Sequence, residues 1–297
     1  MIKVYFVPSD WITREYLLIK QGLENNPRVE LADSEEKGDF VFLFYTALGH
    51  GPQSIHGFPS DKIVFIDYQD QPNAIFGGDC LAYFKRSWVE MVNKENYTTK
   101  KPIHRPSNFH PLMMAIMDEF IINGNVKRDV ALSCMIRPHA GHPNRPRVLD
   151  FIKKINIQGK KQIGEINRGS MSRFNAPDMR EYFKMLRRSR IVVTCNPSQW
   201  EGDFRTWEAF ANGPLVFVDK MYTPMVHPLV NGEHCIFYEA SDLGLKKLEE
   251  QVLYFLKNTT EAEAIAKAGF DFAMKYHRAS NRIDEILQVI NHGRRRR

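Results

Sequence analysis

The alternation of apolar and polar positions predicts a chain of alternating strands and helices. In the first third, three short apolar runs are bounded by turn-forming residues, and a segment with helical spacing lies between the first two. Continuous apolar strands with helices between them indicate a parallel sheet that is covered on both faces. Strands are predicted at 2–8, 39–45 and 62–68, and helices at 13–24 and 110–121.

The same pattern starts again after a polar, turn-forming segment, INGNVKRD at 122–129, which we interpret as an interdomain linker. Two successive α/β modules predict two Rossmann-like domains, 1–124 and 125–279, with a last helix at 280–293 packed back on the first. Ligands of such sheets bind at the carboxyl ends of the strands. The second module has predicted strands at 129–136, 190–197, 215–219 and 234–239, and predicted helices at 148–155, 176–189 and 204–212.

Length and composition are those of a globular protein with two domains. The 297 residues exceed what one hydrophobic core usually serves, and 43% hydrophobic with 26% charged residues is ordinary. The formal net charge is +6, and the run 294–297 supplies four of those charges. The rest of the chain is only mildly basic, so we expect no nucleic-acid partner.

The cysteines and the hydropathy along the chain indicate in which cellular compartment the protein is expected. The four cysteines form no CxxC pair and are predicted to be buried free thiols, which suits a reducing compartment. The first residues, MIKVYFVP, resemble a strand rather than a cleavable signal, and no apolar stretch has the ~20 residues that span a bilayer. We therefore expect a soluble cytoplasmic protein.

The segment GDFRTWEAFANGPLVFVD at 202–219 concentrates charge ahead of an apolar run. It comes after a strand that ends in TCNP, so its helix is expected to start at the carboxyl edge of the sheet, where free N–H groups favour an anion. A guanidinium in the first turn suits a phosphate, and a carboxylate one turn later can accept hydrogen bonds from ribose hydroxyls. The alternative is an i, i+3 ion pair on a surface helix, which contributes little. The candidate nucleotide-binding residues here are Arg205, Glu208, Asp203, Gly202, Asn196 and Pro197.

FRTWEAFANGPLVFVD resembles the R-x-x-E-A-x-A-x-G-x-x-V-x-x-D motif of the group 1 glycosyltransferase superfamily. This variant occurs in spore-maturation-type and exostosin-like transferases and in their algal and large-virus relatives. Two later segments, YTPMVHPLVNGEHCIFYEASDLGLKKLEEQVLYFL and AIAKAGFDFAMKYH, are similar to the segments that come after the motif in that family. The resemblance extends over about 160–280, whereas the N-terminal part is matched only by its strand order and by YFKRSWV.

The resemblance implies a GT-B fold, in which two Rossmann-like domains face each other across a cleft. The C-terminal domain would hold the nucleotide of the donor, with Arg205 on the pyrophosphate and Glu208 on the ribose, and the N-terminal domain would hold the acceptor. Retaining members place a further glutamate eight residues before the ribose-binding one. That position is Trp200 here, with Glu201 one residue away. This departure favours inversion, although a loop shift would restore the retaining arrangement.

Arginines are expected to replace a metal at the diphosphate. A metal-dependent GT-A enzyme needs a D-x-D pair, and DYQD at 67–70 has the wrong spacing. GT-B enzymes can stabilise a leaving diphosphate with cationic side chains, so we expect no metal and no other cofactor. Arg137 and Arg205 are preferred because both come after strand ends, and Arg168 is a further candidate. The alternative for Arg168, as for Arg145, Arg147 and Arg173, is a solvent-exposed side chain.

Inversion requires a general base on the acceptor hydroxyl, from a loop that comes after a strand of the N-terminal domain. Our candidates, in order, are Asp79, Asp10 and His56, and the alternative role for Asp10 is to cap the first helix. Two tryptophans, Trp11 and Trp88, are candidate sugar platforms, whereas Trp207 is expected in the core.

Together these features predict a metal-independent glycosyltransferase, hexosyl or pentosyl, that uses a nucleotide diphosphate sugar, UDP-linked in keeping with the family. Its acceptor would be a glycan or glycoconjugate hydroxyl. One alternative is a non-catalytic sugar-nucleotide or glycan-binding module on the same fold, and another is a periplasmic-type sugar-binding protein. A dinucleotide oxidoreductase lacks its signature, because GHGPQSIHG is not G-x-G-x-x-G.

Overall fold

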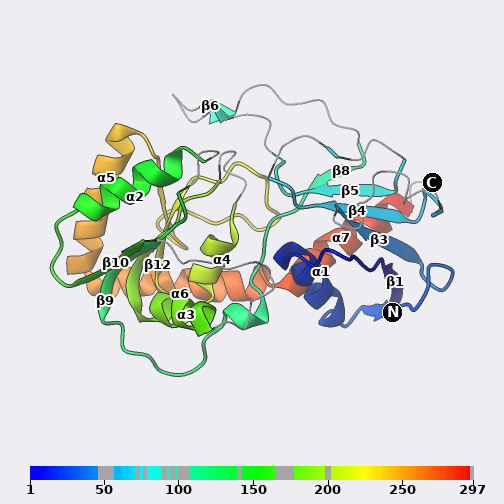
Figure 1. Ribbon diagram of the computed structural model, residues 1–297, viewed down its shortest axis with the longest axis horizontal. Helices are drawn as coiled ribbons and strands as arrows, with labels where there is room; N and C mark the ends of the chain where they lie inside the picture. The colour runs from blue at the N-terminus through cyan, green and yellow to red at the C-terminus, as the bar shows by residue number, and fades with distance from the viewer. Residues whose placement is uncertain are drawn as a thin grey trace.

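The computed structural model contains two parallel sheets that lie next to each other along the long axis of the molecule (Figure 1). Helices cover both sheets, which confirms the predicted α/β class with two Rossmann-like units. The structure describes residues 1–45, 57–70, 74–75, 79–88, 92–93, 98–99, 107–138, 142–164, 177–197 and 202–294.

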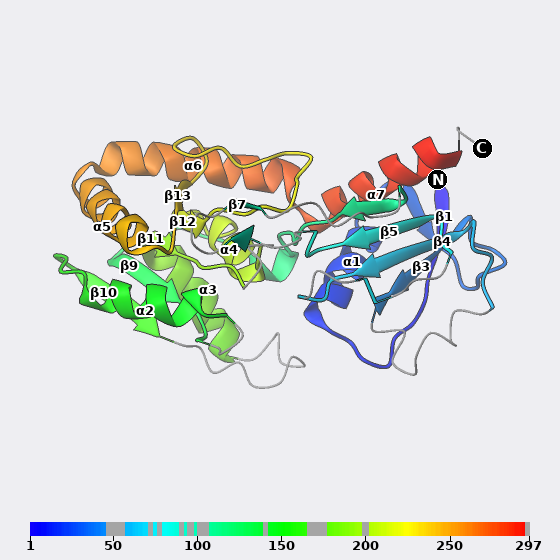
Figure 2. The ribbon, with the colours of Figure 1, turned by 90° about the horizontal axis from the view of Figure 1, so that it is seen from above.

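The N-terminal sheet has the strand order β2-β1-β3-β4-β5-β8, and every pair in it is parallel. Every residue of β3 and β4 is buried, which requires cover on both faces and explains their unbroken apolar sequences, FVFLF and IVFID. In Figure 2 the arrows of β4 and β5 point toward the C-terminal sheet. The strands are β1 (Ile2–Phe6), β2 (Val29–Leu31), β3 (Phe40–Phe44), β4 (Ile63–Asp67), β5 (Ala82–Lys85) and β8 (Phe109–Pro111), with a separate antiparallel pair β6 (Val92–Asn93) and β7 (Thr98–Thr99).

The C-terminal sheet has the order β10-β9-β11-β12-β13 and is also parallel throughout. Its central strands pair in a register that aligns Ile191 with Leu215, so β11 and β12 end at the same edge. The residues after those two ends therefore meet, as expected for a ligand site in such a sheet. The strands are β9 (Val130–Met135), β10 (Lys160–Gly164), β11 (Ser189–Val193), β12 (Leu215–Asp219) and β13 (Ile236–Tyr238).

The helices agree with the predicted periodicity in most places. Helix α1 buries one stripe, and the Thr13 side chain caps it by accepting from the Tyr16 N–H. Asp10 is therefore not the cap, because it lies too far before the helix. The helices are α1 (Arg14–Glu24), α2 (Asn144–Lys154), α3 (Pro177–Arg188), α4 (Phe204–Phe210), α5 (Asp242–Lys257), α6 (Thr259–Tyr276) and α7 (Ala279–Arg294).

The helix predicted at 110–121 is wrong. The chain there forms the end of β8, an extended stretch and a 3₁₀ turn at Asp118–Phe120. The six residues 112–117 are each no more than 2% exposed, so this run has no polar face to present to water. A run that is buried on every side fits an extended segment between two layers as well as a helix, and Pro111 lacks the N–H that a helix interior needs.

The chain crosses between the two sheets twice, and the crossings are bonded to each other. The Ile116 N–H donates to His277 O at 2.7 Å, and the Ala279 N–H donates to Ile116 O at 3.0 Å. After the second crossing, α7 packs on α1 at the N-terminal sheet (Figure 1). Gly22 permits this approach, since a Cβ there would lie 2.6 Å from Ala279 O.

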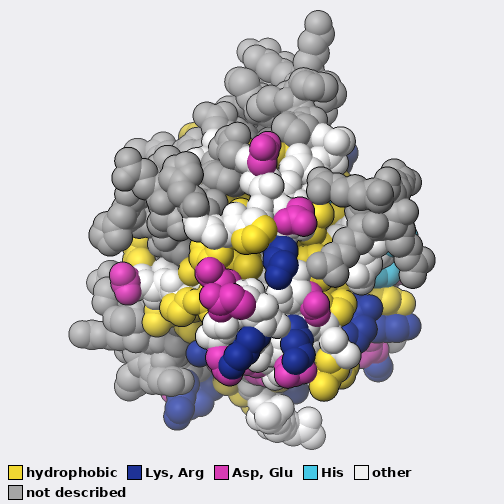
Figure 3. All heavy atoms as spheres, turned by 90° about the vertical axis from the view of Figure 1, so that its right-hand side faces the viewer, with side chains coloured by type: hydrophobic (Ala, Val, Ile, Leu, Met, Phe, Trp, Pro, Cys, Tyr) yellow, Lys and Arg dark blue, Asp and Glu magenta, His cyan; other side chains and the backbone are white. Residues whose placement is uncertain are grey.

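Surface and core carry the features expected of a folded globular chain. On the face of the N-terminal half shown in Figure 3, basic and acidic side chains are intermixed. Cys80, Cys134, Cys195 and Cys235 are all free and buried, as predicted. Among the described residues, no helix is both long and apolar enough to cross a membrane.

Candidate active site

A cluster of two arginines and one aspartate lies where β11 and β12 end. Asp203, at the start of α4, accepts from Arg205 at 2.6 Å and from Arg145 at 2.7 Å through the same oxygen, Oδ2. Arg205 and Asp203 remain 12% and 13% exposed, so part of the cluster reaches solvent. Two guanidiniums on one carboxylate give this group of three a net positive charge. We call these three residues the α4 entry cluster.

Arg145 corrects one expectation from the sequence. Its side chain is only 7% exposed rather than solvated, and its Nε donates to the Cys195 carbonyl at 3.2 Å. Helix α2 brings Arg145 to this edge, because α2 begins one residue earlier, beside the ends of the strands. Its position in the chain after β9 carries no local signal for burial. Arg147, by contrast, is 42% exposed and pairs with Asp242 at the surface.

The floor beneath the cluster is a buried polar contact between β11 and β12. The Asn196 N–H donates to Asp219 Oδ1 at 2.7 Å, and its Nδ2 donates to the Asp219 carbonyl at 2.9 Å. Asn196 and Pro197 are buried, and within the described chain Asn196 Oδ1 has no hydrogen-bond partner. Asn196 and Pro197 thus lie at the same edge as Arg205, and their role in nucleotide binding stays a prediction.

Glu208 faces a different environment from the one predicted. Its side chain is fully buried, with Oε1 in an ion pair with Arg14 and Oε2 accepting from the Tyr182 hydroxyl at 2.9 Å. Arg14 begins α1 in the N-terminal half, and its guanidinium also lies 4.6 Å above the Phe204 ring. In this conformation the carboxylate is therefore not open to ribose hydroxyls. We call Arg14, Glu208 and Tyr182 the buried α4 cluster.

Gly202 is the point at which the N-terminal half reaches this edge. Arg86, which is the residue directly after β5, donates to the Gly202 carbonyl at 2.9 Å and also pairs with Asp70. Gly202 has φ +90°, and a Cβ on it would lie 2.7 Å from Met113 Cε. Only glycine fits both the conformation and the space. The motif YFKRSWV contains Arg86, but its arginine was not among the sequence candidates.

A second buried charge group lies at the carboxyl edge of the N-terminal sheet. Asp67 of β4 and Lys85 of β5 stand opposite each other and form an ion pair of 3.0 Å with both side chains fully buried. Asp67 also accepts from the Tyr83 hydroxyl at 2.5 Å, and Lys85 donates to the Gln69 carbonyl at 2.9 Å. These bonds fix the backbone after β4 and β5, on the same side as Arg86.

Two of the three candidate bases are among the described residues, and they lie at opposite edges of the N-terminal sheet. Asp10 is exposed and comes after β1, at the carboxyl edge, beside the 61% exposed Trp11. Asp79 is also exposed, but it lies three residues before β5 and hence at the opposite, amino edge of the sheet. His56 lies outside the described residues. Of the two that are described, only Asp10 stands on the side where ligands of parallel sheets bind.

The remaining candidates add little to the site. Arg137 is exposed just beyond β9, while Arg168 and Arg173 lie outside the described residues. Trp207 is fully buried, as predicted for a core residue. Burial raises the pKa of all four cysteine thiols, so they stay protonated and are poor nucleophiles. No group of three His, Cys, Asp or Glu side chains in the described ranges could hold a metal ion.

Comparison with known proteins relates the C-terminal half of the chain to a family model and the whole chain to solved structures. Residues 148–288 match the family model described as glycosyl transferase-like. The sequence matched no curated protein. An alpha-glucosyltransferase, AGT, in complex with UDP is similar with a TM-score of 0.62 at 9% identity, over 98% of this chain and 99% of that chain. The same kind of enzyme has also been solved with UDP-glucose and DNA containing an abasic site.

Two further solved structures share the architecture. HepE from Anabaena, in complex with UDP-glucose, has a TM-score of 0.59 at 10% identity and covers 98% of this chain and 100% of that chain. TarM has a TM-score of 0.50 at 10% identity over 85% of this chain, which spans only 54% of TarM. Residues 148–288 therefore match the glycosyl transferase-like family model, and the chain has the GT-B fold seen in these glycosyltransferase structures.

Proposed function

We propose that this protein transfers a sugar from a nucleotide diphosphate sugar, UDP-linked, to a hydroxyl of a glycan or glycoconjugate. The α4 entry cluster is the observation that carries the proposal. It places two guanidiniums, the buried one of Arg145 and the 12% exposed one of Arg205, at the carboxyl edge of the C-terminal sheet, where nucleotides bind in Rossmann-like folds. Two neighbours of the same fold were solved with UDP or UDP-glucose, which supports the choice of nucleotide.

The leaving group of such a transfer is a nucleoside diphosphate, whose negative charge grows as the glycosidic bond breaks. Arg205 and Arg145 would meet that charge with N–H donors that are already oriented by Asp203 and by the Cys195 carbonyl. Donors that are fixed before the reaction stabilise developing charge without reorganising. In our proposal these arginines do the work of a metal ion, and Arg137, exposed just beyond β9, is an additional cation.

For the acceptor side we propose Asp10 as the general base, with Trp11 as the platform for the sugar. Both are exposed at the carboxyl edge of the N-terminal sheet. The absence of a carboxylate at the position of Trp200 favours inversion, in which the base deprotonates the acceptor hydroxyl for a single displacement. Arg86 would support this arrangement by holding the Gly202 carbonyl, so that the two edges keep their spacing.

Glu208 would contribute indirectly in this proposal. The ion pair with Arg14 fixes α4 against α1, and α4 in turn carries Arg205 and Asp203 at its start. A ribose could reach the Glu208 carboxylate only after Arg14 and Tyr182 had moved. Glu208 is thus proposed as a positioning residue for the entry cluster.

The test is a thermal-unfolding series with UDP, GDP, CDP and UDP-glucose, without added metal, on the wild type and on Arg205→Ala. A nucleotide at about 100 times its Kd should stabilise the wild type by about 2.7 kcal/mol. Arg205→Ala should lose most of that gain, whereas Arg147→Ala, a surface arginine of α2, should keep it. NMR of the anomeric proton in the transfer product would then report inversion or retention.

Absence of stabilisation by any nucleotide at millimolar concentration, on a folded wild type, would overturn the proposal. Stabilisation without transfer to any glycan acceptor would instead favour a binding module. A DNA acceptor is included as a separate arm, because one neighbour was solved with DNA. We expect no transfer to it, since the chain apart from its four terminal arginines is only mildly basic and offers little attraction for a phosphate backbone.

A further inference from the structure

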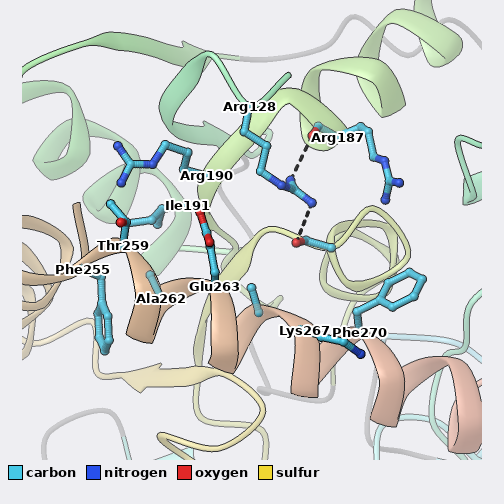
Figure 4. Close-up of a pocket in the computed structure, with 12 residues that line it drawn as sticks. Arg128, Arg187, Arg190, Ile191, Phe255, Thr259, Ala262, Glu263, Lys267 and Phe270 are labelled. Atoms are coloured by element: carbon cyan, nitrogen blue, oxygen red, sulfur yellow. Dashed lines mark hydrogen bonds between the residues drawn. The ribbon is translucent and has the colours of Figure 1, made fainter. Parts of the chain in front are cut away.

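A cavity of about 650 Å³ lies at the amino edge of the C-terminal sheet, the edge opposite the one that carries the α4 entry cluster. Its walls come from Arg128 ahead of β9, from the α3–β11 junction, from Gly213 ahead of β12, from Phe255 of α5 and from α6 between Thr259 and Phe270 (Figure 4). The strands run parallel, so this is their amino edge, whereas Asp203 and Arg205 lie beyond their carboxyl ends. Strands of about five residues at about 3.3 Å per residue separate the two edges by roughly 15 Å. The cavity and the donor site are therefore distinct.

Three arginines from three segments line this cavity. Figure 4 shows Arg128 between Arg190 and Arg187, across from the α6 residues Glu263 and Lys267. Within the described chain none of the three arginines forms an ion pair, and the hydrogen bonds that they donate go to backbone carbonyls. Lys267 of the lining pairs with Asp271. Among the described lining residues, Glu263 is the one that carries a carboxylate, and it faces three guanidiniums. The cavity therefore carries excess positive charge.

The arginines differ in the donors that they have left for a ligand. Both terminal nitrogens of Arg128 donate hydrogen bonds to backbone carbonyls, at 2.7–3.1 Å. The four acceptors are the carbonyls of Arg187, Ser189, Asn212 and Gly213. It thus holds the ends of α3 and α4 together. Arg187 makes two such bonds and Arg190 makes one. Because a guanidinium has five N–H donors, each of these two arginines keeps donors that can bind a ligand. Burial, and to a smaller extent the nearby Arg187 charge, lowers the pKa of Arg128 to about 10.

The rest of the lining suits a molecule with an anionic group and an apolar body. Thr259 is the first residue of α6, a helix of 18 residues. The side chain of the preceding residue, Asn258, makes no capping hydrogen bond, so no side chain at the cap satisfies the first N–H groups of the helix. Apolar side chains, Ile191, Phe255 and Phe270 among them, line the remainder. A volume of 650 Å³ is within the range of about 300–1,000 Å³ that small-molecule sites show.

We propose that this cavity binds a phosphate-bearing small molecule, with Arg187 and Arg190 as its phosphate ligands and Arg128 as their structural support. The site is separate from the donor site and does not depend on the proposed transferase activity. A purely structural alternative exists for the same residues: the arginines lie near the C-terminal ends of α3, α4 and α5, whose carbonyls attract cations. That alternative makes no place for a ligand, and the experiment separates the two.

The experiment is a calorimetric titration of the full chain with inorganic pyrophosphate as the probe. Pyrophosphate could also reach the entry cluster, so the titration is made on Arg205→Ala as well as on the wild type. We expect saturable binding in both, weakened about tenfold by Arg187→Gln or Arg190→Gln in the Arg205→Ala background. Arg188→Gln is the matched control, because Arg188 is adjacent in sequence but pairs with Asp129 outside the cavity. It should change the affinity less than about twofold.

Hydrogen exchange gives a second readout that needs no variant in the cavity. Pyrophosphate should slow exchange in the first turns of α6, around 259–266, in the Arg205→Ala protein. Malonate, a dicarboxylate of similar size, should bind more weakly if phosphate is the group recognised. Binding that disappears in Arg205→Ala, equal weakening by Arg188→Gln, or no change of exchange in α6 would each overturn the proposal. Tighter binding of malonate would replace phosphate by a carboxylate and would likewise overturn it.

Discussion

Two charge clusters sit on successive turns of α4 and meet opposite environments. The entry cluster, Asp203 with Arg205 and Arg145, belongs wholly to the C-terminal half and stays partly exposed. In the buried α4 cluster the Glu208 carboxylate is fully enclosed, and its partner Arg14 comes from the other half of the chain. The entry cluster keeps N–H donors that a ligand can reach, whereas the charges of the buried α4 cluster pair with each other inside the protein. The same short helix therefore carries a proposed binding function at one end and a cohesive function in its middle.

Charge in a motif consequently does not reveal its role until its partners are known. Arg205 and Glu208, three residues apart, are chemically the natural partners of each other on a helix surface. In the structure each bonds elsewhere, Arg205 to Asp203 and Glu208 to Arg14 and Tyr182. Breaking the two clusters separately should therefore give different phenotypes, stability for one and ligand affinity for the other.

Removal of the Glu208 carboxylate should have the largest effect. Glu208→Ala leaves the Arg14 guanidinium, 9% exposed, without its counter-ion, and breaking a buried pair on one side costs about 3–5 kcal/mol of unfolding free energy. Urea unfolding measures the loss. Glu208→Gln, which keeps the shape and one acceptor, should lose less. Glu181→Ala removes an exposed carboxylate of α3 and should be near neutral.

The double variant Arg14→Met with Glu208→Ala sharpens this result. Because it removes both charges, it should regain part of the stability that Glu208→Ala loses. If Glu208→Ala loses less than about 1 kcal/mol, the pair does not hold the halves together as we argue.

Arg145→Lys should affect ligand affinity instead. Lysine keeps the charge but cannot donate to the Cys195 carbonyl and to Asp203 at once, as the arginine fork does. We expect UDP to bind about tenfold more weakly, which corresponds to about 1.4 kcal/mol. Calorimetric titration of UDP measures this, with Arg147→Lys as the surface control. Unchanged affinity in Arg145→Lys would mean that only the charge of Arg145 matters.

The features that the sequence predicted correctly are those that depend on neighbours in the chain. Four of the five strands of the C-terminal sheet and the position of α4 were predicted from period and turn residues, whereas β10 was not. The parallel-sheet rule then brings Asn196, Gly202 and Arg205 to one edge. The burial of Trp207 was predicted on the same basis.

The features that it missed depend on partners far away in the chain. Arg14 and Glu208 are 194 residues apart, and Arg86 and Gly202 are 116 apart. Periodicity within one segment contains no information on which segment of the other module will face it. The extended run 112–117 is of the same kind: its burial on all sides comes from the two layers between which it passes, and the pattern alone was misread as a helix.

A histidine, His277, packs against the opposite face of α4 and makes the stability of the protein depend on pH. Trp207 stacks on His277 at 4.5 Å, and burial, together with the Arg282 charge, lowers the pKa of His277 to about 2. The folded state thus excludes a proton that the unfolded state binds below pH ~6.5, so stability falls as the pH drops through that value. Burial raises the pKa of Glu285, which pairs with Arg282, so this carboxylate takes up its proton at a higher pH than an ordinary glutamate and opposes the His277 effect in that range.

Unfolding free energies at pH ~6.5 and pH ~5.5 should therefore differ by about 1 kcal/mol in the wild type from His277 alone. His277→Gln should flatten this part of the profile, measured by urea unfolding at each pH. His234 serves as a comparison, because burial lowers its pKa too, and His234→Gln should flatten only its own share. An unchanged slope in His277→Gln would show that His277 has the same pKa in the folded and unfolded states, against the burial argued above.

The smallest effect is expected where an ion pair lies at the surface. Asp129 accepts two hydrogen bonds from Arg188, and this pairing lowers the pKa of Asp129 to about 2, yet each side chain is 39% exposed. Water and salt screen such a pair, and ordering two long side chains offsets much of the attraction. Asp129→Asn should therefore leave the urea midpoint at physiological salt within the error of measurement. A large loss would mean that geometry, rather than burial, separates the strong from the weak pairs of this protein, and the contrast between the two clusters of α4 would then need another cause.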